Sequence, residues 1–193
     1  MSVSPGGRRV PLGVGAAAGV LAWLLGYLLT YVATSGRIRE FQGSFLGRVA
    51  DLFGLEVPTW KIVGWVFYNA HFVDTAAGSG TGSAVGGDGF TALLYALPPV
   101  VLLAAGLAVG RAAGSGDAAT DALAGASVLI GYLPLSILGV LLFETTIAGT
   151  TVAPALVPGV LLAGVLYPAV FGAVGAGLAA LTADGGGSTA PQL

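Results

Sequence analysis

The sequence has 193 residues, of which 55% are hydrophobic and 8% are charged, and it has a formal net charge of −2 and no cysteine. The lack of a basic surplus argues against a nucleic-acid partner, and the lack of thiols excludes disulfides, thiolate metal sites and cysteine nucleophiles. The length predicts a single domain over residues 1–193. The acidic surplus and the heavy use of alanine, glycine and valine suggest a haloarchaeal protein.

Long uncharged stretches dominate the chain. Each holds the ~20 apolar residues that a helix rising ~1.5 Å per residue needs to cross ~30 Å of hydrocarbon. A soluble helix would keep one charged face, so the lipid bilayer is the expected surroundings. The sequence therefore predicts an all-α integral membrane bundle with four transmembrane helices, at about 12–33, 90–110, 122–143 and 155–181.

Positive charges near the ends of the spans predict the orientation. Arg8 and Arg9 precede the first span, and Arg111 follows the second. By the positive-inside rule both termini are cytoplasmic, in the cell membrane, and residues 37–88 lie outside. Four further cations in 37–88 oppose this assignment. An export signal is the alternative for the paired arginines, but the apolar run exceeds the roughly 7–15 residues that such signals use.

The insert between the first two spans, residues 37–77, is predicted to form one or two additional helices. Within it, 37–53 form an amphipathic helix, either in the membrane interface or packed on the rest of the protein. Residues 59–77 are apolar, yet only twelve residues separate Lys61 from Asp74. About 18 Å of helix is too short to cross, so we expect a buried or half-inserted helix. The amphipathic stripe consists of Ile38, Phe41, Phe45, Val49, Leu52 and Phe53.

The remaining segments are predicted to be loops. Residues 78–89 are rich in glycine and serine without the ending of a phosphate-binding loop, so we expect a flexible linker. Residues 145–154 are uncharged but polar and are expected to form an exposed turn. Residues 184–193 are expected to form a flexible tail.

The single histidine lies in a polar group near the end of the half-inserted helix. Tyr68, His71 and Asp74 follow at intervals of three, so adjacent ones are helix neighbours, and Asn69 lies beside them. The predicted topology brings Glu144 to the same outer face. A carboxylate beside the imidazole would raise the pKa of His71 and orient it for proton relay. We expect instead a structural, hydrogen-bonded His71 that tethers the helix to the loop near Glu144.

Three spans place a tyrosine shortly before a proline. Proline frees a carbonyl in a helix, and transporters use such broken helices to build a transport path, although prolines are also common in ordinary membrane helices. The pairs are Tyr95 with Pro98, Tyr132 with Pro134, and Tyr167 with Pro168. Small residues four apart predict close helix packing, within or between chains, at Gly15 and Gly19, Gly106 and Gly110, and Gly172 and Ala176.

Residues 57–73, VPTWKIVGWVFYNAHFV, resemble a family of small haloarchaeal multi-span membrane proteins of unknown function, sometimes loosely labelled as transporters. The resemblance implies a membrane fold and no particular activity. With no catalytic motif, no cofactor-binding motif and too few ligands for a metal site, we expect a non-enzymatic integral membrane protein. It would be an accessory subunit or a self-associating scaffold, with its own copies or a membrane complex as partner. The alternative is a small oligomeric transporter or channel that uses the tyrosine–proline breaks.

Overall fold

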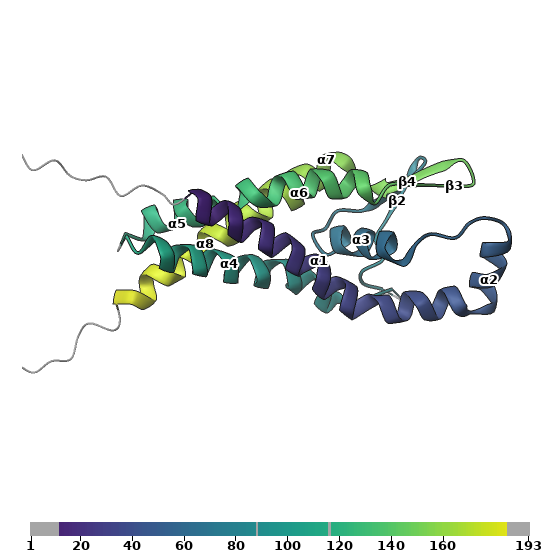
Figure 1. Ribbon diagram of the computed structural model, residues 1–193, viewed down its shortest axis with the longest axis horizontal. Helices are drawn as coiled ribbons and strands as arrows, with labels where there is room; N and C mark the ends of the chain where they lie inside the picture. The colour runs from purple at the N-terminus through teal and green to yellow at the C-terminus, as the bar shows by residue number, and fades with distance from the viewer. Residues whose placement is uncertain (1–11, 88, 116, 185–193) are drawn as a thin grey trace, which may run out of the picture.

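The computed structural model describes residues 12–87, 89–115 and 117–184. Its helices form a long bundle with a head at one end, where α2 (Phe45–Leu52) and four short strands lie (Figure 1). The long helix α1 (Leu12–Gly43) begins at the opposite end of the bundle. The last helix, α8 (Tyr167–Asp184), ends there too.

Four helical stretches among the described residues are long and apolar enough to cross a membrane. Their limits lie within a few residues of the predicted spans, except that the first continues to Gly43 instead of ending near residue 33. The four stretches are Leu12–Gly43, Ala92–Ala113, Ala118–Leu142 and Leu156–Thr182.

Three of these stretches are assembled from shorter helices. The second joins a 3₁₀ turn, η1 (Ala92–Ala96), to α4 (Leu97–Ala113). The third is interrupted between α5 (Ala118–Ala126) and α6 (Leu129–Leu142). The fourth consists of α7 (Leu156–Pro158), the π-helix η2 (Gly159–Leu166) and α8.

A proline accounts for the π-helix. Pro168 is the second residue of α8 and has no N–H to donate to the carbonyl of Gly164, four residues earlier. The turn that precedes it is therefore free to widen, and η2 ends directly before Tyr167.

The helices approach most closely at glycines in the half of the bundle away from the head. A side chain at Gly106 of α4 would overlap the Gly172 backbone of α8, and one at Gly110 would lie 2.7 Å from the Ala176 Cα. Gly15 likewise meets Ser127, and Gly19 meets the Val128 carbonyl. The small-residue faces seen in the sequence are therefore used for packing within the chain.

The first helix does not end near residue 33, because its polar residues are satisfied internally. The hydroxyls of Thr30 and Thr34 donate to carbonyls four residues earlier, at 2.8 and 2.7 Å. The helix breaks only at Ser44, whose hydroxyl accepts a backbone N–H at 3.2 Å and caps α2. The single amphipathic helix predicted over 37–53 is therefore divided into the end of α1 and α2.

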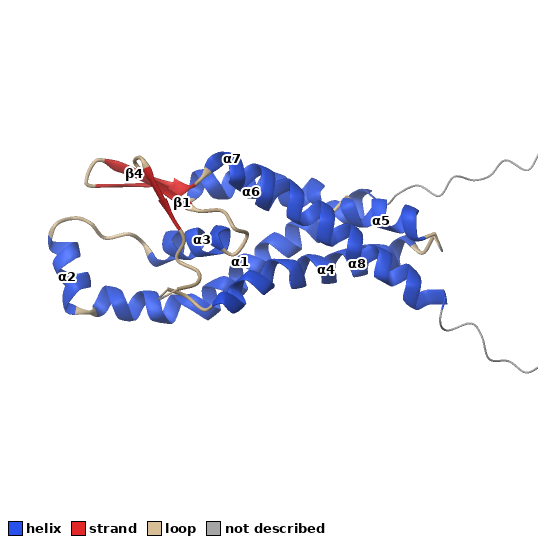
Figure 2. Ribbon diagram, turned by 180° about the vertical axis from the view of Figure 1, so that it is seen from behind, coloured by secondary structure: helices blue, strands red, loops and turns tan. Residues whose placement is uncertain are grey.

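The prediction of an all-α fold is confirmed only in part: the chain is mostly helical, but the head contains a four-stranded antiparallel sheet in the order β2-β1-β4-β3 (Figure 2). Its strands are β1 (Thr75–Ala77), β2 (Gly80–Gly82), β3 (Thr145–Ile147) and β4 (Thr150–Pro154).

Two tight turns explain the strands. Gly78 has a φ of 59° between β1 and β2, and Ala148 and Gly149 have φ values of 47° and 79° between β3 and β4. Two consecutive residues of positive φ are typical of a two-residue hairpin. The predicted linker 78–89 and exposed turn 145–154 thus both contribute strands, and β1 joins the two hairpins by pairing with β4.

The short helix α3 (Thr59–Asn69) enters the bundle from the head, and the chain then reverses at residues 70–74 (Figure 1). We call residues 70–74 the tip. Val63, Val66 and Phe67 of α3 are fully buried. The helix covers the first part of the apolar segment 59–77, and the tip and β1 form the rest.

Candidate functional site

His71 lies at the tip and is fully buried. Its Nδ1 is 2.8 Å from the carbonyl oxygen of Phe67, and its Nε2 is 2.8 Å from the hydroxyl of Tyr132 on α6. A carbonyl can only accept, so Nδ1 carries the proton and Nε2 accepts from the tyrosine. Both ring nitrogens are satisfied in the neutral imidazole.

The surroundings of His71 disfavour its charged form. The imidazole packs against the rings of Phe67 and Tyr167, with centroids 4.8 and 5.1 Å away. His71 belongs to none of the four long apolar stretches. Burial lowers its pKa from 6.5 to about 4, while the hydrogen bond to the Phe67 carbonyl acts in the opposite direction. The raised pKa that an adjacent Asp74 carboxylate would cause is therefore not found.

The two carboxylates that the sequence placed near His71 lie elsewhere. Asp74 and Glu144 are exposed, and neither is a hydrogen-bond partner of the imidazole. Their backbone carbonyls instead accept hydrogen bonds. The Asp74 carbonyl accepts from Ala155 N–H at 2.9 Å, and the Glu144 carbonyl accepts from Lys61 Nζ at 2.5 Å. The chain reverses after Asn69, so Asp74 no longer follows the helical spacing assumed from the sequence.

Asn69 holds the tip in place. Its amide nitrogen donates to the Val73 carbonyl at 2.8 Å and to the Thr75 hydroxyl at 3.3 Å. Its amide oxygen accepts from the backbone N–H of Ala84 at 2.8 Å. One buried side chain thus fastens the end of α3, the start of β1 and the segment that follows β2.

We expect Asn69→Ala to lower the free energy of unfolding by roughly 1–3 kcal/mol, because it leaves buried donors and acceptors without partners. Asp74→Ala, five residues away and exposed, is the matched control and should change it by less than about 0.5 kcal/mol. Denaturation in detergent, followed by circular dichroism, gives both values. Equal losses would mean that the tip is held by other contacts.

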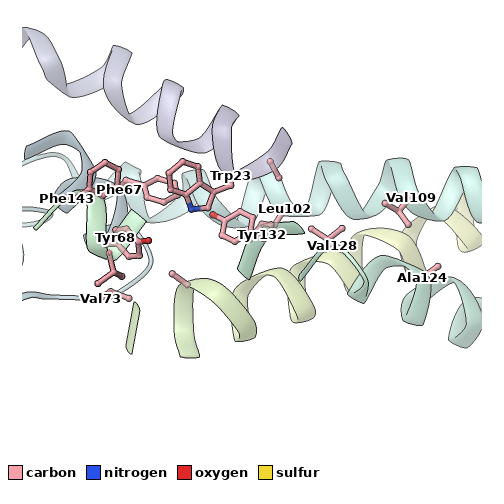
Figure 3. Close-up of a cluster of buried hydrophobic side chains, with 13 residues drawn as sticks. Trp23, Phe67, Tyr68, Val73, Leu102, Val109, Ala124, Val128, Tyr132 and Phe143 are labelled. Carbon is pink, nitrogen blue, oxygen red and sulfur yellow. The ribbon is translucent and has the colours of Figure 1, made fainter. Parts of the chain in front are cut away.

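Tyr68, Tyr132 and Ser136 extend the buried polar group around His71 into α6. We call these four side chains the polar centre. The Tyr68 hydroxyl donates to the Ser136 carbonyl, and the Ser136 hydroxyl donates to the Tyr132 carbonyl at 3.1 Å. Figure 3 shows Trp23 of α1 directed toward the same region. In the described part of the chain, Trp23 Nε1 is the one buried side-chain nitrogen or oxygen without a hydrogen-bond partner.

An aromatic cluster closes this centre on the side of the head. The ring of Phe143 lies 5.4 Å from that of Tyr27 and 6.4 Å from that of Trp23, both nearly parallel to it. Gly64 of α3 leaves space for the Phe143 ring, since any Cβ there would overlap it. The Trp65 indole donates to the Phe143 carbonyl at 2.8 Å. Phe143 and Trp23 were not predicted from the sequence as part of this centre, and the position of Trp23 in the middle of a span was the one signal for it.

The tyrosines of the three tyrosine–proline pairs differ in their contacts. Tyr132 and Tyr167 both contact His71, but Tyr95 instead donates to the Val85 carbonyl at 2.9 Å and stacks on Phe72 at 4.3 Å.

The three prolines also differ in their effects on the helices. Pro98 is in the first turn of α4, where the missing N–H costs nothing. Pro134 lies inside α6, which continues through it, and Pro168 is the second residue of α8, after Tyr167, which follows the π-helix.

The described residues contain no group of three His, Cys, Asp or Glu side chains that could hold a metal ion. The fold is that of a mostly helical protein with four helices long and apolar enough to span a membrane, a small sheet and a buried polar centre. The chain belongs to a family of unknown function, DUF7978, which matches residues 2–183. No curated protein and no solved structure matches the chain.

Proposed function

We propose that this protein is a non-enzymatic integral membrane protein, an accessory subunit or self-associating scaffold of a haloarchaeal cell membrane. Exposed leucines and valines along the four long stretches support contact with lipid, because such side chains would be costly in water. Examples are Leu21, Leu28, Val32, Leu138, Leu141, Leu161, Val170 and Leu181. Four crossings return the chain to its starting side, and the positive charge at Arg8, Arg9 and Arg111 favours the cytoplasm for that side.

The observation that carries this proposal is the filled centre of the bundle. Phe67, Tyr68, His71, Leu102 and Tyr132 are all at most 1% exposed, and the polar atoms of the imidazole and of both tyrosines are engaged in hydrogen bonds within the chain. A transport path needs polar groups that are free to bind a substrate or water. Apart from Trp23 Nε1, the polar groups of the centre are satisfied within the chain, which favours a scaffold over a transporter.

Reconstitution and purification together test the proposal. In liposomes, the purified protein should give no pH-dependent ion flux above that of protein-free liposomes. From native membranes, a tagged chain should copurify with a stoichiometric partner or with an untagged copy of itself. A flux that His71→Gln abolishes without unfolding the protein, and that Asp74→Asn leaves intact, would replace the scaffold with a transporter.

A further inference from the structure

An apolar groove of about 390 Å³ runs between α1 and α4 on the outside of the bundle. All of its lining side chains are aliphatic, and they belong to two of the four stretches that are long and apolar enough to cross a membrane. Alanines make the groove, because they leave room where leucine or valine would fill it. They are Ala18 and Ala22 of α1, and Ala104, Ala105 and Ala108 of α4.

The groove is too narrow for another helix. It follows α4 from Val100 to Ala108, which is about 12 Å of helix. The mean cross-section of the groove is therefore about 30 Å². A helix with its side chains is ~10–12 Å across and needs more than twice that area. A single hydrocarbon chain is thin enough to fit.

A cation lies beyond the groove, at the end of the bundle away from the head. Arg111 is exposed in the last turn of α4, which ends on that side (Figure 1). It follows Ala104 by seven residues and Ala108 by three, the spacing of side chains on one face of a helix. Arg111 therefore shares the face of α4 that lines the groove, about 4.5 Å of helix beyond Ala108.

The acidic residues that follow Arg111 are engaged elsewhere. The Asp117 carboxylate accepts from the backbone N–H and the hydroxyl of Thr120, at 2.8 and 2.6 Å. The Asp121 carboxylate accepts from the backbone N–H of Ser115 at 3.2 Å. In the part of the chain that the structure describes, Arg111 forms no ion pair. Its guanidinium is available to an anion from outside the chain, and its forked donors match a phosphate.

We infer that the groove and Arg111 bind an anionic phospholipid of the cytoplasmic leaflet, an inference that rests on the proposed membrane protein and its orientation. One hydrocarbon chain lies in the groove, and the phosphate binds the guanidinium. The lengths agree, because Val100 and Arg111 are about 16 Å apart along the helix, roughly half of the ~30 Å hydrocarbon core. Basic sites between membrane helices on the cytoplasmic side commonly bind anionic head groups.

Native mass spectrometry of the protein in detergent micelles tests the head group, because it resolves each bound lipid. The probes are phosphatidylglycerol and phosphatidylcholine with the same oleoyl chains. The first phosphatidylglycerol should bind about fivefold more tightly than phosphatidylcholine, the effect of one cation on an anionic lipid. Arg111→Gln should remove this preference. Arg48→Gln, also exposed but on α2 in the head, is the control and should retain it.

Filling the groove tests the hydrocarbon chain. Ala104→Leu combined with Ala108→Leu places larger side chains where the lipid chain lies. Both lipids should then bind roughly threefold more weakly or worse, since packing against the helices holds a chain in the groove when the alternative is a micelle. Ala17→Leu, exposed on α1 outside the groove, is the control and should change neither affinity. Circular dichroism checks that each variant folds.

Three results would overturn the inference. The first is equal affinity for the two lipids, or a preference that survives Arg111→Gln. The second is unchanged lipid binding after both leucine substitutions. The third is a dimer in the same spectra that these substitutions dissociate, which would show that a second copy fills the groove. The proposed function is tested separately: release of the protein from native membranes by alkaline carbonate would reject a membrane protein, and an ion flux would reject the scaffold, whatever the lipids show.

Discussion

Gly175→Ala is expected to lower the free energy of unfolding by about 1–3 kcal/mol, the usual cost of forcing extra atoms into a packed interior. A Cβ at Gly175 of α8 would overlap the carbonyl oxygen of Leu103 in α4 and lie 2.9 Å from the Leu107 nitrogen. Both obstacles are backbone atoms, so no side chain can rotate away and the two helices must separate. Denaturation with SDS in mixed micelles, followed by circular dichroism, measures the loss.

Gly177→Ala is the matched control, two residues further along the same helix. Nothing lies within 4 Å of a Cβ at Gly177. Alanine has the better helix propensity, so this variant should be as stable as the original protein or more stable by up to about 1 kcal/mol. If the two variants were equally stable, the close approach of α4 and α8 would be contradicted.

The second large effect expected is a loss of stability in acid that depends on His71. The unfolded chain takes up a proton on this histidine near pH 6.5, whereas the folded chain holds it neutral down to about pH 4. Stability should therefore be complete above pH 6.5 and fall as the pH drops toward 4. The total loss from this group is on the order of 3 kcal/mol. Denaturation at pH 7, 5.5 and 4.5 measures it.

His71→Gln should remove most of this dependence and keep the fold, because glutamine still offers a donor and an acceptor to Phe67 and Tyr132. Asp74→Asn should retain the dependence of the original protein, since that carboxylate is exposed and does not contact the imidazole. If His71→Gln lost stability in acid as steeply as the original protein, other groups would have to be responsible.

The four long helical stretches could be predicted from the sequence, but the end of α1 and the sheet of the head could not. Uncharged length is a local property, so the four apolar stretches were located within a few residues. The end of α1 was misplaced because Thr30 and Thr34 satisfy their hydroxyls inside the helix, which composition does not reveal. The sheet was missed because the pairing of β1 with β4 joins segments about 75 residues apart and each strand is very short. In β1 and β2, alanine and glycine also disfavour a strand.

The polar centre could likewise be predicted only in part from the sequence. Tyr68 and His71 were recognised as neighbours from their spacing, and both are buried in the centre. The partner of His71 is Tyr132, 61 residues away, and no local pattern relates the two. The reversal at the tip, where Phe72 has a φ of 58°, moved Asp74 out of the predicted cluster. Phe72 is neither glycine nor asparagine, so the sequence contained no warning of a turn there.

The position of α3 has a consequence for how the protein is made. His71, just after α3, contacts Tyr132 of α6 and Tyr167 of α8. Both tyrosines leave the ribosome long after α3 itself. Until then α3 has α1 and the segment that contains Val85 and Leu94 beside it, and eleven residues of helix with Lys61 are too short to cross a membrane on their own. We therefore expect the order of assembly to differ from the order of synthesis, with α3 docking last, after the C-terminal helices.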